Sequence, residues 1–261
     1  MAELKAVIFD VDGTLADTER DGHRLAFNRA FADAGLGWHW DIETYGRLLE
    51  VTGGKERIRQ FVDELVVDEL GPCFHAPADI EGFIRKLHES KTCHYLSLLK
   101  SGAIPLRPGV ERLINESRAA GLRLAIATTT TPENVTTLLR TKLSEESIGW
   151  FDVIAAGDIV PRKKPAPDIY HYALQRLGLK AAECLAIEDS ENGLAAATGA
   201  GIKTIITVND YTQLQDFTSA AIVLDHLGEP DTSFKVLAGD VREATLVDLP
   251  LLHSVCGDSQ Q

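Results

Sequence analysis

The stretch AVIFDVDGTL, residues 6–15, determines how the rest of the sequence is interpreted. Four apolar residues, typical of a buried strand, run directly into two acids, Asp10 and Asp12, which are followed by Gly13. Carboxylates at the end of a buried strand are costly unless another charge offsets theirs. The stretch therefore predicts a strand whose end carries paired carboxylates next to a cation or a basic side chain.

The composition is typical of a globular protein with a surplus of negative charge. The chain has 261 residues, of which 44% are hydrophobic and 25% charged, and its formal net charge is −13. This charge argues against nucleic acid or an anionic membrane surface as the main partner. The sequence shows no signal-peptide pattern and no run of about 18 apolar residues, so we expect a cytoplasmic protein without a membrane span.

Cysteine usage also favours a reducing compartment. The cysteines are Cys73, Cys93, Cys184 and Cys256. They are widely spaced and form no CxxC pair, which argues against a disulfide framework or a zinc site.

The chain contains two kinds of sequence. Between about residues 17 and 100, apolar residues recur at helical spacing, as at Phe27, Ala30 and Phe31, and no strand-like run interrupts them. Strand-like runs lie at residues 4–9, 122–128, 151–156, 184–188, 203–208 and 220–225. Their alternation with helical segments is typical of a parallel sheet with crossover helices.

These patterns predict an α/β fold with two domains. We expect a Rossmann-like, doubly wound parallel-sheet core formed by residues 1–16 and 101–230. An inserted all-α helical cap of residues 17–100 would leave this core after the first strand, where a loop tip tolerates added chain. Residues 231–261 would form a C-terminal extension with one helix near residues 245–254.

Side chains able to do chemistry follow several of the predicted strands. They are Asp10, Asp12, Thr128, Lys164, Glu188 and Asp189. In an open α/β sheet, ligands bind beyond the carboxyl ends of the strands, so we expect these side chains to converge there. Mg²⁺ is typically held by one or two carboxylates together with water and substrate phosphate. Asp10, Glu188 and Asp189 are therefore candidate magnesium ligands.

The same residues suit phosphoryl transfer. Asp10 could attack phosphorus and form an aspartyl-phosphate. Asp12, on the same side if the strand stays regular, could protonate the leaving oxygen and then activate water. Lys164 and the cation would neutralise developing charge, and Thr128 offers a hydroxyl to a phosphoryl oxygen. Gly13 would let backbone N–H groups approach the phosphate.

Each feature alone has a plainer interpretation. Asp-x-Asp-Gly is often a turn or part of a calcium loop, although the acids here follow a strand and not the helix of an EF-hand. Thr128 could be an ordinary hydroxyl at a strand end, since Thr131 and Pro132 are typical of a helix start. Lys164 could lie in a loop before a helix, and Glu188 to Ser190 could cap one. Their joint occurrence at strand ends favours the catalytic interpretation.

With these residues assembled, the sequence resembles the haloacid dehalogenase superfamily of phosphotransferases over about residues 1–230. The motifs that carry the resemblance are FDVDGTLADTE (9–19), AIATT (125–129), KKPAPDIY (163–170) and IEDSENGLAAATGAG (187–201). It implies Asp10 as nucleophile and Asp12 as general acid and base. The implied ligands of Mg²⁺ are Asp10, the Asp12 backbone carbonyl, Glu188 and Asp189. The implied phosphate-binding residues are Thr128, Lys164 and Thr129, with Thr130 an alternative to Thr129.

The helical part resembles the cap of the β-phosphoglucomutase-like subgroup, and more narrowly the CbbY family. The motifs are DTERDGHRLAFNRAF (17–31), WDIETYGRLLEVTGGKERI (40–58) and PLRPGV (105–110). Members of that family dephosphorylate xylulose 1,5-bisphosphate, a sugar bisphosphate that inhibits Rubisco. Lys55 and Arg57, beside Gly53 and Gly54, would suit a second phosphate, although the pattern is equally typical of a glycine turn before a helix.

Three further residues are candidates for contact with the sugar hydroxyls or the distal phosphate. They are Glu19, His23 and Arg107. A single histidine on a helix is more often a surface or packing residue.

The predicted function is that of a Mg²⁺-dependent phosphatase acting on a sugar bisphosphate, with xylulose 1,5-bisphosphate favoured and a small molecule as the only partner of a monomer. The alternatives are a β-phosphoglucomutase-like phosphotransferase and a phosphoglycolate phosphatase. A haloalkanoate dehalogenase would need neither a metal nor Asp12. A phosphosugar-binding module would not need Asp12 either.

Overall fold

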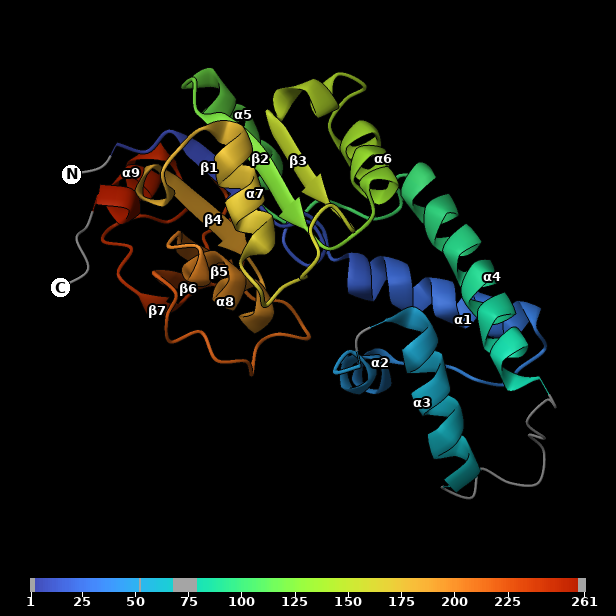
Figure 1. The fold of residues 1–261 in the computed structure, drawn as a ribbon. Coiled ribbons are helices and arrows are strands. Elements are labelled where there is room, and N and C mark those ends of the chain that lie inside the picture. The colour runs from blue at the N-terminus through green and yellow to red at the C-terminus, as the bar shows by residue number, and fades with distance from the viewer. Residues whose placement is uncertain (1–2, 52, 68–78, 258–261) are drawn as a thin grey trace. The chain divides into compact units, whose positions relative to one another are not determined.

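The computed structural model describes residues 3–51, 53–67 and 79–257, and the chain divides into two compact units (Figure 1). The sheet unit comprises residues 1–17 and 104–261, and the helical unit comprises residues 18–103. The chain therefore leaves the sheet unit once, soon after its first strand, and returns to it once.

The sheet unit is built on a seven-stranded sheet with the order β3-β2-β1-β4-β5-β6-β7. The strands are β1 (Ala6–Phe9), β2 (Arg123–Thr128), β3 (Val153–Ala156), β4 (Cys184–Glu188), β5 (Lys203–Thr207), β6 (Ile222–Leu224) and β7 (Val236–Gly239). β1 pairs in parallel with β2 and β4, so that Ala6 lies opposite both Arg123 and Cys184. All pairs from β3 across to β6 are parallel, which confirms the predicted fold class.

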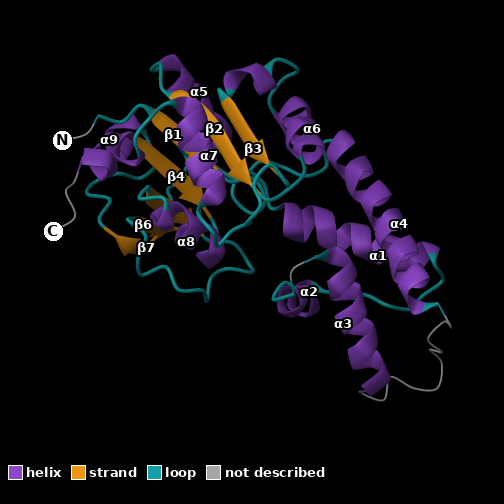
Figure 2. Ribbon diagram, viewed as in Figure 1, coloured by secondary structure: helices purple, strands orange, loops and turns teal. Residues whose placement is uncertain are grey.

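Helices surround this sheet (Figure 2). They are α5 (Val110–Ala119), α6 (Pro132–Lys142), α7 (Asp168–Leu177), α8 (Glu191–Gly199) and α9 (Leu249–Gly257), with 3₁₀ turns at Ser147–Trp150 and Ala181–Glu183. Ala6 and Ile8 of β1 pack with α7 and α8 on one face. Val7 and Phe9 alternate with them and point to the opposite face. Because β1 is buried on both faces, its sequence is continuously apolar.

The C-terminal segment differs from the predicted extension. β7 adds to β6 as an antiparallel edge strand, and α9 contacts β4, so residues 231–257 contribute to the sheet unit. All four residues of β7 are exposed although its sequence, VLAG, is apolar throughout, so no alternation of apolar and polar residues reveals the strand. Only its pairing with β6 defines it.

The helical unit holds a π-helical turn (Glu19–His23), α1 (Arg24–Asp33), α2 (Ile42–Leu48), α3 (Gly54–Val67) and α4 (Ile80–Lys100). Its described part contains no strand. Phe27 and Phe31 of α1 pack against Trp40, and Phe27 also contacts Tyr45, which forms an aromatic core. The helical spacing seen at Phe27, Ala30 and Phe31 is therefore the buried face of α1.

Two expectations about the whole chain concern its cysteines and its helices. Cys93, Cys184 and Cys256 are free thiols, while Cys73 lies outside the described residues. In the described ranges, no helix combines the length and the hydropathy needed to cross a bilayer.

Candidate active site

The loop after β1 places the acids of the opening motif. The Asp10 N–H donates to the carbonyl of Ile187 at 3.0 Å, which carries the β1–β4 pairing one step past the strand end. The chain then turns, because the N–H groups of Thr14 and Leu15 both donate to the carbonyl of Val11. Asp12 therefore lies half-buried in a turn and not on a regular strand, so strand alternation does not place it beside Asp10.

Lys164 lies between two carboxylates at the carboxyl edge of the sheet. Its ammonium donates to Asp10 Oδ1 at 2.6 Å, to Glu188 Oε1 at 2.5 Å and to the carbonyl of Ala127 at 2.8 Å. Asp10 follows β1, Glu188 ends β4, and Ala127 is the second-to-last residue of β2, so the three acceptors come from the carboxyl ends of neighbouring strands. The geometry therefore brings Asp10, Lys164 and Glu188 together, as their positions after predicted strands indicated.

The electrostatic setting distinguishes Lys164 from its neighbour in sequence. Burial lowers the pKa of the Lys164 ammonium, but the charges of Asp10 and Glu188 more than compensate, so the pKa lies above its usual value. Lys163 instead pairs with Asp158 at 2.8 Å, and both side chains are exposed. Of the two adjacent lysines, only Lys164 reaches the carboxylates.

Asp10, Glu188 and Asp189 form a buried cluster. Carboxylate oxygens of the three residues lie within 4.8 Å of one another. Glu188 is completely buried, and its Oε1 also accepts a hydrogen bond from the Tyr170 hydroxyl at 2.5 Å. Its Oε2 is buried and has no hydrogen-bond partner among the described residues. A buried carboxylate oxygen in this state is suited to a cation.

The ionised form of Glu188 and of Asp189 is energetically unfavourable in this cluster. Burial raises the pKa of Glu188 to about 7 although Lys164 opposes the shift. Burial, followed by the charge of Asp10, raises the pKa of Asp189 well above its usual value. The Lys164 ammonium contacts two of the three carboxylates, and the charge of Arg107 also acts on Asp189. Three carboxylates still outnumber these two cations, so a divalent cation with oxygen ligands would balance the cluster. The residues present fit such an ion.

Asp189 is oriented by two residues that the sequence reading did not select. Its Oδ1 accepts from the Thr14 hydroxyl at 3.4 Å, and its Oδ2 accepts from Asn209 Nδ2 at 2.7 Å. Gly13 lies against both Asp189 and Asn209 and has φ +87°, so a Cβ there would collide with them. Asn209 follows β5 just as the predicted site residues follow their strands, which is the signal that could have found it.

The threonine run after β2 provides hydroxyl groups and a helix cap. Thr128 is buried, and its Oγ1 accepts from the N–H of Thr130 at 3.3 Å. Thr129 is exposed, while Thr130 Oγ1 accepts from Asn134 Nδ2 at 3.1 Å. Thr131 caps α6 by accepting from the N–H of Asn134, as its helix-start pattern predicted. Phosphate binding by Thr128 and Thr129 stays a prediction.

Within the helical unit, Glu19 and Arg57 meet through a tyrosine. Tyr45 OH donates to Glu19 Oε2 at 2.5 Å, and Arg57 Nη1 donates to Tyr45 OH at 3.2 Å. Arg57 also lies 3.9 Å from Glu19 and donates to the carbonyl of Val51. Tyr45 is buried and was not selected from sequence, because its spacing marks it only as a core residue.

His23 is a packed residue with a polar neighbour. Its ring stacks on Tyr95 with centroids 3.8 Å apart, and its Nδ1 lies 2.7 Å from the ammonium of Lys91. Burial, and then the charge of Lys91, lowers the pKa of His23 well below its usual value. The imidazole is therefore neutral at pH 7, so the Lys91 ammonium donates to its Nδ1.

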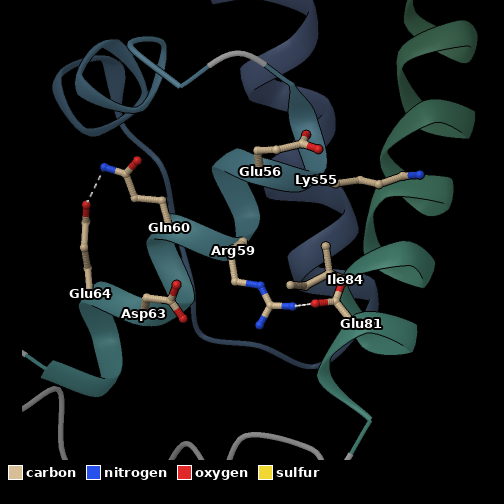
Figure 3. A pocket seen from close by; sticks show the side chains of 8 residues that line it. All are labelled: Lys55, Glu56, Arg59, Gln60, Asp63, Glu64, Glu81 and Ile84. Carbon is tan, nitrogen blue, oxygen red and sulfur yellow. Dashed lines mark hydrogen bonds and ion pairs between the residues drawn. The ribbon is translucent and has the colours of Figure 1, made fainter.

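Lys55 is not brought together with Arg57. The two residues lie two positions apart in α3, so their side chains leave different sides of the helix. Lys55 lines a cavity of about 720 Å³ on the helical unit, and Figure 3 shows it extending from α3 toward α4, away from the ion pair of Arg59 and Glu81. The expectation that Lys55 and Arg57 act together on one phosphate is not supported by this placement.

Arg107 also differs from its expected place. Its side chain is buried, and Nη1 and Nη2 donate to main-chain carbonyls, among them Thr207 O at 2.8 Å and Asp225 O at 2.7 Å. Its Nε lies 3.4 Å from Asp17. A guanidinium whose donors are committed in this way does not fit the contact with sugar hydroxyls or the distal phosphate that was expected from sequence.

Known proteins similar to this chain identify its family. Residues 4–201 match the haloacid dehalogenase-like hydrolases. The chain belongs to this family. The plasmid CbbY protein of Cupriavidus necator is 49% identical over 87% of each chain. A crystal structure of a CbbY mutant from Rhodobacter sphaeroides, in complex with xylulose 1,5-bisphosphate, is 45% identical with a TM-score of 0.71, covering 86% of this chain and 96% of the other.

A more distant relative carries a name that describes its activity. The phosphorylated carbohydrates phosphatase of Thermotoga maritima is 31% identical, with 84% of this chain and 94% of the relative covered. The chain is thus a hydrolase of the haloacid dehalogenase type, and its relatives support a phosphatase activity.

Proposed function

We propose that the chain is a Mg²⁺-dependent phosphatase that hydrolyses a sugar bisphosphate, namely xylulose 1,5-bisphosphate. The observation that carries the proposal is the buried group of Asp10, Glu188 and Asp189 around Lys164, in a chain of this hydrolase family. The substrate is taken from the xylulose 1,5-bisphosphate complex of the similar CbbY structure.

The candidate ligands of Mg²⁺ are side-chain oxygens of Asp10, Glu188 and Asp189 and the backbone carbonyl of Asp12. The fit rests on the surplus of carboxylate charge and on the buried Glu188 Oε2, which has no hydrogen-bond partner among the described residues. When bound, Mg²⁺ would neutralise charge on the phosphoryl oxygens and reduce their repulsion of the nucleophile.

The reaction would proceed in two displacements at phosphorus. The Asp10 carboxylate forms a bond to phosphorus while the bond to the sugar oxygen breaks, and Asp12 gives its proton to that oxygen. Water then attacks the aspartyl-phosphate, Asp12 takes a proton from it, and Asp10 is released together with inorganic phosphate. Lys164 holds Asp10 from one side and offers positive charge to the phosphoryl group, and Thr128 would donate its hydroxyl to a phosphoryl oxygen.

Recognition of the rest of the substrate is assigned to the helical unit. Arg57, Tyr45 and Glu19 form one hydrogen-bonded group that combines a cation, a hydroxyl and a carboxylate. The cation is suited to a second phosphate, and the carboxylate to sugar hydroxyls. His23, neutral and held at Nδ1 by Lys91, has Nε2–H as a donor for a hydroxyl oxygen.

The partners and the cellular setting remain predictions. The net charge of −13 supports a small-molecule substrate and argues against nucleic acid or an anionic membrane as a partner. A monomer in the cytoplasm is the simplest state consistent with the sequence.

The test is phosphate release by the purified protein, with and without Mg²⁺, from xylulose 1,5-bisphosphate, ribulose 1,5-bisphosphate, β-glucose 1-phosphate and phosphoglycolate. We expect strong Mg²⁺-dependent release from the first and little from the others, with the Asp10→Asn variant inactive on all. Preference for another compound would refute xylulose 1,5-bisphosphate as the substrate, but it would be consistent with the proposed phosphatase reaction. No release, together with conversion of β-glucose 1-phosphate to an isomer, would favour the mutase alternative.

A further inference from the structure

Arg107 lies at the carboxyl edge of the sheet and makes several hydrogen bonds there that the proposed chemistry does not use. Nη1 donates to the carbonyl of Gly13 and, at 2.8 Å, to that of Thr207. Nη2 donates to the carbonyls of Val208 at 2.5 Å and Asp225 at 2.7 Å. One guanidinium therefore connects the loops that follow β1, β5 and β6.

Two of these carbonyls, those of Gly13 and Val208, belong to the residues that precede the two hydrogen-bond donors to Asp189. The residue after Gly13 is Thr14, and the residue after Val208 is Asn209. These are the two residues that donate hydrogen bonds to Asp189, to Oδ1 and Oδ2 respectively. Arg107 thus holds the peptide group immediately before each residue that orients Asp189.

Arg107 also joins the two places where the chain passes between the units. Its own N–H donates to the carbonyl of Leu15 at 2.9 Å, and its Nε lies 3.4 Å from Asp17 Oδ1. Ala16 and Leu106 form an antiparallel bridge beside it. The outgoing segment is therefore held to the returning one by the main chain of Arg107 and Leu106, and through Asp17 by the same side chain that fixes the loops around Asp189.

We propose that Arg107 is a positioning residue for the metal site: it sets the loops of Thr14 and Asn209 so that Asp189 presents its carboxylate to the cation. The inference rests on the proposed role of Asp189 as a metal ligand. Residues that orient a metal ligand from outside its coordination sphere typically change metal affinity by about 10–100-fold when replaced. Lysine cannot substitute, since a single ammonium does not present the planar fork that meets carbonyls of two loops.

Arg112 provides a matched control. It is also an arginine of the sheet unit that donates to two main-chain carbonyls, Leu227 O at 3.2 Å and Gly228 O at 2.9 Å. Its other neighbours are Glu116 and Glu229, so none of its contacts reaches the loops that hold Asp189. Arg112→Lys removes a comparable set of bonds without disturbing the proposed chain of contacts.

The experiment measures Mn²⁺ binding to the substrate-free protein by titration calorimetry or by electron paramagnetic resonance, with Mg²⁺ as competitor. We expect Arg107→Lys to raise the Kd for Mn²⁺ about tenfold and Arg112→Lys to leave it within about twofold. Asn209→Ala should raise it as well, and the Arg107→Lys/Asn209→Ala double variant should be less impaired than the product of the single effects.

Several results would overturn the inference. Equal effects of Arg107→Lys and Arg112→Lys would mean that Arg107 only stabilises the fold. Normal Mn²⁺ affinity in Asn209→Ala would remove the route through that residue, and this variant keeps the test valid even if Arg107→Lys does not fold. Asp189→Asn separates the two proposals. If the wild-type protein binds Mn²⁺ independently of Asp189, the metal assignment fails, and this inference with it; if binding needs Asp189 but tolerates Arg107→Lys, this inference alone fails.

Discussion

The sheet unit and the helical unit each hold a group of charged side chains, buried in the sheet unit and half-buried in the helical unit, and the two groups balance their charges differently. In the sheet unit, the Lys164 ammonium pairs with Asp10 and Glu188, and the Asp189 carboxylate lies beside them. In the helical unit, one guanidinium and one carboxylate are connected through the Tyr45 hydroxyl. The first group has a surplus of negative charge that a cation would answer, while the second is balanced without a ligand.

This difference in charge balance suits the sheet unit's group to the chemical step and the helical unit's group to substrate recognition. A group with surplus charge holds its carboxylates ready for a cation and an incoming phosphate, and it is costly until they bind. A balanced group costs less by itself, and it binds an anion only by exchanging one partner for another. Under the proposed function, changes in the sheet unit should therefore affect turnover and stability, whereas changes in the helical unit should affect substrate preference.

The largest expected effect is on the chemistry itself. Asp12→Asn should lower kcat by about 10²–10⁴-fold, because an amide can neither give a proton to the leaving oxygen nor take one from water. Mn²⁺ affinity should be nearly unchanged, since only the backbone carbonyl of Asp12 is assigned to the metal. Steady-state phosphate release and calorimetry on the same preparation check both points. Normal turnover would rule out the acid–base role.

The second prediction concerns the surplus of negative charge in the sheet unit's carboxylate cluster, and it is tested by removing the Lys164 ammonium. Lys164→Met should lower the free energy of unfolding by about 3–5 kcal/mol without metal, because Asp10 and Glu188 would be left buried and unpaired. Millimolar Mg²⁺ should recover part of this loss. Lys163→Met, which removes an exposed ammonium paired with Asp158, is the control and should leave urea unfolding unchanged. Equal stability of the two variants would contradict the interpretation of the cluster.

The proposed role of the helical unit in substrate recognition can be tested at Arg57. Arg57→Ala should raise KM for xylulose 1,5-bisphosphate by about 10–100-fold, the cost of a lost charge-assisted contact, with a much smaller effect on a sugar monophosphate. Arg59→Ala is the matched control, since Arg59 lies two positions further along α3 and pairs with Glu81. Equal effects of Arg57→Ala on both substrates would remove the distal-phosphate role.

The smallest expected effect is the contribution of His23, in the helical unit, to the pH dependence of the free energy of unfolding. Burial and the charge of Lys91 lower the pKa of His23 below its unfolded value of about 6.5, so below that pH the unfolded chain binds the extra proton. Stability is therefore retained above pH 6.5 and lost as the pH falls. Between pH 6.5 and 5.5, the wild-type protein should lose about 1 kcal/mol more than His23→Gln in urea unfolding.

If His23→Gln kept the wild-type pH dependence of stability, His23 would not titrate as a desolvated neutral group.

The sequence alone was sufficient to predict which side chains lie at the carboxyl ends of the strands. Asp10, Thr128 and Glu188 follow or end apolar runs, and parallel strands end at one edge, so local hydrophobic pattern alone predicts that they converge. Lys164 also lies beside Asp10 and Glu188, as its position after a predicted strand indicated. By contrast, β7 is exposed on both faces, so no alternation of apolar and polar residues marks it, and it is defined only by its pairing with β6.

What the sequence determined by itself was the fold class and the group of acids with their lysine, because both follow from short-range apolar patterns and from the order of strands. Tertiary structure alone decided which donor meets which oxygen. It directed Arg107 to the carbonyls around Asp189 and separated Lys55 from Arg57. It also brought Tyr45 to Glu19 and Asn209 to Asp189. The physical reason is range: a strand end is defined by a few neighbours, but the direction of a long polar side chain depends on elements far away in the chain.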